Sequence, residues 1–121
     1  MSITPPPNDF GTVPVIHKAS EWYKAIYTFS SKISKKDRFG IYLKIEHGAL
    51  ELIDLLLVAA LEDKDKKYLP LRNARLKTES LKRLIRICYE IGVVDLKHYI
   101  NFEYPLQEIS KMINGWIKYL R

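Results

Sequence analysis

The chain has 121 residues with a formal net charge of +6, and 47% of its residues are hydrophobic. This length suits one folded domain with a core of its own and is too short for two. The hydrophobic content excludes an intrinsically disordered protein, and charged residues interrupt each apolar run before it could cross a bilayer. A single cysteine, Cys88, excludes a disulfide framework. We expect a cytoplasmic protein, since the first residues also lack the pattern of a signal peptide.

The charge balance is basic, with 20 Lys and Arg against 14 Asp and Glu. A basic surface attracts polyanions, which include nucleic acids, anionic membrane surfaces and acidic proteins. Net charge alone does not choose among these partners.

The amino-terminal residues are rich in proline. Pro5, Pro6 and Pro7 fall in a stretch without hydrophobic periodicity, which predicts a mobile tail over residues 1–13 and a helical domain over residues 14–121. Pro14 suits the first turn of a helix, because no amide hydrogen is needed there. The next apolar residues are spaced alternately four and three apart, which predicts the first helix. They are Val15, Ala19, Trp22, Ile26, Phe29 and Ile33.

A second helix is predicted from Arg38 to Leu61. Its last third, residues 55–61, is apolar on all sides, so we expect protein to cover it from several directions. Two apolar stripes run along this helix. The first contains Tyr42, Ile45, Ala49, Leu52, Leu56 and Ala59, and the second contains Phe39, Leu43, Leu50, Ile53 and Leu57.

A third helix is predicted from Lys66 to Ile91. Pro70 is tolerated if it lies in the first turn, and Gly92 is a suitable residue just beyond the carboxyl end. The residues predicted to be buried on this helix are Leu69, Leu76, Leu84, Ile87, Cys88 and Ile91.

A fourth helix is predicted to begin after Asp95, which would cap its amino end. Pro105 cannot donate to the carbonyl of Asn101, so we expect it to interrupt and kink this helix. Four amphipathic helices with short connections predict an all-α fold, an antiparallel up-down-up-down four-helix bundle.

The third predicted helix concentrates the positive charge. At about 100° per residue, five of its cations fall within an arc of about 100°. We call them the basic ridge: Arg72, Arg75, Lys82, Arg83 and Arg86. They are candidate nucleic-acid-binding residues, because guanidinium groups match phosphate oxygens and grip a backbone without reading bases. The alternative is a solvated face whose cations pair with Glu79, Glu90 and the acidic second helix.

Hydrophobic residues exceed what one bundle protomer needs to bury. The second helix has two apolar stripes, and the apolar arc of the third helix extends further through Leu81 and Ile85. Such a surplus predicts self-association, which would also multiply the basic ridge.

Catalytic and metal-binding patterns are weak, so we expect neither an enzyme nor a cofactor or metal. Asp95 and His98 have the spacing of one metal-ligand pair, but a helix cap explains Asp95 more simply. His47 and Glu51 are expected to form a surface pair. Glu46 is expected to be buried beside a cation. Cys88 is predicted to be an inert core thiol.

Several segments resemble accessory variability determinant proteins, the small four-helix partners of the reverse transcriptase in diversity-generating retroelements. The similar segments cover about residues 14–118. They are Pro14-Val15-Ile16 through Trp22-Tyr23, Lys36-Asp37-Arg38-Phe39, Leu43-Lys44-Ile45-Glu46, Leu71-Arg72-x-Ala74-Arg75-x-Lys77, Leu81-Lys82-x-Leu84-Ile85-Arg86 and Gly115-Trp116-Ile117-Lys118. Two positions depart from the family, namely Pro105 in the fourth helix and Asn114, where a second glycine is common.

The resemblance implies a homopentameric barrel with a basic surface and no catalysis of its own. Its implied partners are the reverse transcriptase, the retroelement's template RNA or an RNA–DNA hybrid, and further copies of itself, with no membrane. It supports nucleic-acid contact at the basic ridge, where the basic pattern matches. A wider relative, the four-helix proteins encoded in ribosomal-RNA intervening sequences, implies the alternative of a structural protein that mainly contacts other proteins. A metal-binding bundle is a weaker third possibility.

Overall fold

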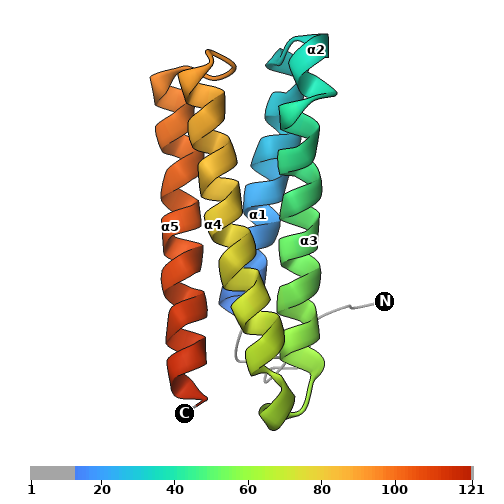
Figure 1. Cartoon of the computed structure of the whole chain (residues 1–121), viewed down its shortest axis with the longest axis vertical. Helices are drawn as coiled ribbons and strands as arrows, with labels where there is room; N and C mark the ends of the chain where they lie inside the picture. The colour runs from blue at the N-terminus through green and yellow to red at the C-terminus, as the bar shows by residue number, and fades with distance from the viewer. Residues whose placement is uncertain (1–12, 121) are drawn as a thin grey trace, which may run out of the picture.

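The computed structural model describes residues 13–120, and that part of the chain is all-helical with four long helices (Figure 1). The predicted all-α class and the number of long helices are confirmed. The elements are α1 (Val13–Phe29), the 3-10 turn η1 (Ser30–Lys32), α2 (Lys35–Arg38), α3 (Ile41–Leu61), the 3-10 turn η2 (Lys64–Lys66), α4 (Tyr68–Glu90) and α5 (Leu96–Tyr119).

Helix α1 follows its predicted pattern as far as Phe29, whereas Ile33, which the spacing also assigned to this helix, is buried beyond it, after η1. Val13, which we assigned to the tail, is its first residue, while the rest of the predicted tail (residues 1–12) lies outside the described residues. Trp22 is buried, and its indole Nε1 donates a 2.8 Å hydrogen bond to the main-chain oxygen of Phe102 in α5. The Tyr42 hydroxyl of α3 donates a 2.6 Å hydrogen bond to the main-chain oxygen of Ile26. Both buried polar groups therefore tie α1 to a neighbour without an unpaired donor.

The predicted second helix is divided in two. The short α2 ends at Arg38, and α3 begins at Ile41 after a break at Phe39 and Gly40. Because the chain turns there, Phe39 does not extend the apolar stripe of α3, and its side chain is 63% exposed. The prediction of one helix from Arg38 was wrong at this end, since hydrophobic periodicity alone does not reveal a local break at glycine.

One stripe of α3 forms core, and the other does not. All members of the stripe from Tyr42 to Ala59 are buried. The second stripe stays partly open, with Leu50 and Leu57 exposed. Val58 and Leu61 are also exposed, so within the described protomer the apolar end of α3 lacks the cover that we expected on several sides.

The helix boundaries on α4 and α5 follow their capping residues. Pro70 lies in the first turn of α4, and Gly92 has a φ of 84°, a left-handed conformation that favours glycine after a helix end. Asp95 caps α5 by accepting a 2.9 Å hydrogen bond from the His98 amide. The helix then continues through Pro105 to Tyr119, so the expected interruption at the proline was wrong.

The buried face of α4 differs from the predicted one. Cys88 is buried as expected, whereas Leu84 and Ile87 are only half-buried. Leu69, Leu76 and Ile91 are more than half exposed. The core side is instead formed by Pro70, Leu71, Ala74, Thr78, Leu81, Ile85 and Cys88.

The apolar arc of α4 is therefore wider than the part that its neighbours cover. We call the part that neighbours cover least the outer apolar face. It consists of four residues of α4 and the residue that directly follows the helix: Leu69, Leu76, Leu84, Ile87 and Ile91.

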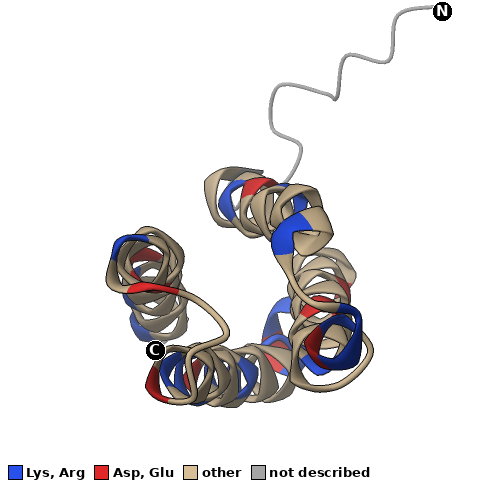
Figure 2. Cartoon of the chain, turned by 90° about the horizontal axis from the view of Figure 1, so that it is seen from above, with Lys and Arg blue, Asp and Glu red and all other residues tan. Residues whose placement is uncertain are grey.

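The long helices pack as neighbours around a shared core (Figures 1 and 2). Helix α4 contacts α3 on one side and α5 on the other, and α1 contacts α3 and α5. The Lys67 ammonium group joins two elements, because it donates to the main-chain oxygens of Ala59 and Ala60 and lies 6.0 Å from the Trp116 ring centroid. It thereby satisfies carbonyls at the end of α3 that the helix itself leaves unpaired.

Candidate nucleic-acid interface

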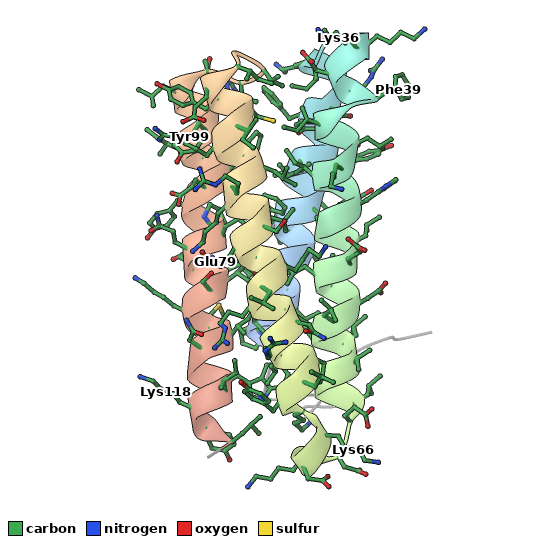
Figure 3. The ribbon with its side chains drawn as sticks, viewed as in Figure 1. Lys36, Phe39, Lys66, Glu79, Tyr99 and Lys118 are labelled. Carbon is green, nitrogen blue, oxygen red and sulfur yellow. The ribbon has the colours of Figure 1, made fainter. Side chains whose placement is uncertain are left out.

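The basic ridge lies on the side of α4 that borders α5. Two contacts fix this orientation, since Glu79 accepts a 3.3 Å hydrogen bond from the α5 residue Ser110 and Tyr89 stacks on Tyr99 of α5. Figure 3 labels Tyr99 towards one end of this side, Glu79 near its middle and Lys118 near the other end. The ridge therefore follows the α4–α5 contact along the bundle. Arg72, Arg83 and Arg86 of the ridge are exposed. Arg75 and Lys82 are half-buried.

Two ridge cations are paired with acids of their own helix. The Lys82 ammonium lies 2.9 Å from a Glu79 carboxylate oxygen, and Nε of Arg86 lies 3.0 Å from a Glu90 carboxylate oxygen. Pairs of this kind at a spacing of three or four residues are weak and screened by salt. The solvated alternative is thus correct for these two side chains.

Three ridge arginines remain available for an anion. Arg72, Arg75 and Arg83 form no ion pair with any residue in the range 13–120. The expected pairing with the acidic second helix involves a different cation, because Glu51 of α3 binds Lys77 at 3.0 Å. Glu51 therefore does not pair with His47 as we predicted, and the Lys77 ammonium holds the pKa of Glu51 below its usual range. The unpaired arginines are the core of the candidate interface.

Aromatic rings border one end of the ridge, and sequence reasoning missed them. The rings of Tyr89 and Tyr99 are stacked with their centroids 5.1 Å apart, and the Arg86 guanidinium lies over both. The partners of Lys82 and Arg86 could have been found from their spacing along α4. The contact between Tyr89 and Tyr99 could not, because it depends on how α5 folds back on α4.

The other residues considered for chemistry have structural surroundings. Cys88 is buried, and burial raises the pKa of its thiol to about 11, which suits an unreactive core residue. Glu46 is half-buried, and burial raises the pKa of its carboxyl, which the nearby His47 and Arg38 oppose. The expected ion pair of Glu46 is not formed with any described residue.

Asp95 and His98 form the cap rather than part of a larger ligand cluster. His98 Nδ1 lies 2.7 Å from Asp95 Oδ1, and the main-chain and side-chain contacts with His98 lower the pKa of Asp95. Among the described residues, no group of three or more His, Cys, Asp and Glu side chains is arranged to hold a metal ion. None of the described helices combines the length and hydrophobicity needed to cross a membrane.

Comparisons with protein families, curated proteins and solved structures give no match to this chain.

Proposed function

We propose that the chain is a non-catalytic accessory subunit of a diversity-generating retroelement, which binds template RNA and the reverse transcriptase. The observation that carries this proposal is the row of arginines on α4. Arg72 and Arg83 are exposed, Arg75 is half-buried, and none of them has an acidic partner in the described part of the chain. An unpaired guanidinium group can form two parallel hydrogen bonds to phosphate oxygens without first breaking an ion pair.

The ridge suits the backbone of a nucleic acid more than its base pairs. An α-helix can read bases by entering the major groove of DNA, but one flank of α4 is packed against α5 and the other against α3. Its arginines can still contact successive phosphates from the surface. Affinity then comes mainly from counterion release, while selectivity comes from RNA shape or from the protein partner.

Self-association is the second part of the proposal. The protomer is an up-down-up-down bundle, and copies assemble into a homopentameric barrel through apolar surface that the protomer leaves open. The outer apolar face supports this, since Leu69 and Leu76 of α4 and Ile91 directly after the helix are 61%, 51% and 62% exposed. Several weak ridges on one assembly would bind a long RNA by avidity.

The same apolar face favours a second candidate function. A structural four-helix protein of the intervening-sequence kind would use this face to contact other proteins and would need no RNA. The two functions differ in a measurable way, because only the first requires the arginines of the ridge.

The proposal is tested by co-expressing the chain with a retroelement reverse transcriptase and template RNA from the same genome, then recovering the complex. Wild type is expected to retain both the polymerase and the RNA. The double variant Arg72→Glu/Arg83→Glu is expected to lose RNA after nuclease-free washing while its helix content stays unchanged. If wild type recovers neither RNA nor polymerase, the accessory function is contradicted. If it instead recovers other proteins through the outer apolar face, the structural function is favoured.

A further inference from the structure

A cluster of two aromatic rings and one cation lies at one end of the basic ridge. Tyr89 lies in the last turn of α4 and Tyr99 in the first turns of α5, and their ring planes are 24° apart with a centroid distance of 5.1 Å. The Arg86 guanidinium carbon lies 5.7 Å from the Tyr89 ring centroid and 5.6 Å from that of Tyr99. Three planar groups are thus gathered in one place, and two different helices supply them.

The cluster is fixed in position but still open to solvent. Glu90 holds Arg86 at 3.0 Å, and hydrogen bonding to the side chains of Tyr99 and Glu90 raises the pKa of Arg86. The Arg86 side chain is 48% exposed, and both tyrosines are half-buried rather than buried. Each of the three side chains therefore has solvent-exposed surface that a ligand can reach, and these groups lose little freedom when it binds.

The chemistry of these groups matches an unpaired base. Bases of single-stranded nucleic acids stack on tyrosine rings and on arginine planes, whereas the bases of a duplex are already stacked on each other. Arg83 lies less than one turn before Arg86 on α4 and is exposed without an ion pair among residues 13–120. A phosphate at Arg83 and a base at the cluster would belong to the same strand.

We propose that Arg86, Tyr89 and Tyr99 form a stacking site for an unpaired base of single-stranded RNA whose phosphates follow the basic ridge. This inference rests on the proposed RNA-binding function and adds the strand state of the ligand. It assigns binding roles to Tyr89 and Tyr99, and it gives Arg86 a second role besides its charge.

The test compares two single-stranded RNA oligomers of equal length, one made of uridines and one abasic, so that both carry the same phosphates. Wild type is expected to bind the oligouridine at least about fivefold more tightly, the lower end for one stacked base. Tyr99→Leu keeps an apolar side chain at this half-buried position but removes the ring. It is expected to reduce the preference for oligouridine and to leave the affinity for the abasic oligomer unchanged, while Tyr99→Phe keeps the preference.

A second readout uses the unmutated protein. An oligomer with 2-aminopurine at one position is expected to lose fluorescence on binding, since stacking quenches this base, and a duplex of the same sequence should compete weakly. Equal affinity of wild type for the uridine and abasic oligomers, or an unchanged preference in Tyr99→Leu, overturns the stacking site but leaves phosphate binding intact. Failure of wild type to bind either oligomer instead overturns the proposed RNA-binding function.

Discussion

Leu81 of α4 packs directly against Gly48 of α3. Both residues are buried. A Cβ atom at position 48 would lie 2.8 Å from Cδ2 of Leu81, closer than non-bonded carbon atoms approach in proteins. The missing side chain at Gly48 therefore leaves the space between α3 and α4 that the end of the Leu81 side chain occupies. Since α4 carries the basic ridge, this contact also helps to hold the ridge in place.

Substitution of Gly48 tests the close approach. Gly48→Leu is expected to lower the free energy of unfolding by about 1–3 kcal/mol, the usual cost of overpacking a core. Gly115→Leu is the matched control, because a Cβ at that exposed helical position meets nothing within 4 Å. Removing glycine there should stabilise the protein by about 0.5–1 kcal/mol. Chemical denaturation measures both changes, and a Gly48→Leu variant as stable as wild type would contradict overpacking at this contact.

The amino-terminal cap of α5 gives a prediction with a defined pH dependence. The pKa of Asp95 is lowered by its main-chain and side-chain contacts with His98, so its carboxylate stabilises the fold above the ordinary carboxyl pKa. This contribution is lost as the pH falls through the lowered pKa of Asp95. Asp95→Ala should reduce Tm by a few degrees at neutral pH, and Asp95→Asn by less, because asparagine also caps helices. Thermal melts at neutral and acidic pH check this, and a wild-type advantage that persists in strong acid would contradict it.

The buried face of the first helix was predicted more accurately than that of α4. On α1, each of Val15, Ala19, Trp22 and Ile26 is buried as its spacing predicted, because polar residues flank a single apolar stripe. On α4 the apolar arc covers more than half of the helix. Periodicity then identifies an apolar side but not the part of it that neighbours cover.

Only part of the candidate site was predicted from the sequence. The arc of five cations could be found from sequence, since it depends only on helix geometry. The distinction between paired and unpaired cations needs side-chain positions, and so does the stacking of Tyr89 on Tyr99. Charge patterns along one helix are local, whereas the contacts of α4 with α5 depend on the packing of the whole bundle.

Assembly can be tested at the outer apolar face. Leu76 is 51% exposed, so Leu76→Glu should leave the protomer folded while it places a charge in any interface formed by this face. Light scattering is expected to give wild type a multiple of 14.2 kDa and Leu76→Glu a mass of 14.2 kDa. Leu56, with no exposed surface, cannot separate interface from core in this way.

The control for this experiment is Tyr27→Glu. Tyr27 is 61% exposed and lies on α1, away from the outer apolar face. The Tyr27→Glu variant should keep the wild-type mass. A wild type that scatters as a 14.2 kDa protomer at micromolar concentration would contradict self-association.

The salt dependence of RNA binding tests the central role of the ridge most directly. Arg72→Glu/Arg83→Glu should bind a single-stranded RNA more weakly than wild type, and the slope of log affinity against log salt should decrease by about 1.4, or about 0.7 for each lost phosphate contact. Lys36→Glu/Lys66→Glu is the control, because it changes the net charge by the same amount as the ridge variant. Its two substitutions lie at the opposite ends of the bundle (Figure 3). It should leave the slope near that of wild type. A ridge variant with the same affinity and slope as wild type would contradict RNA binding by these arginines.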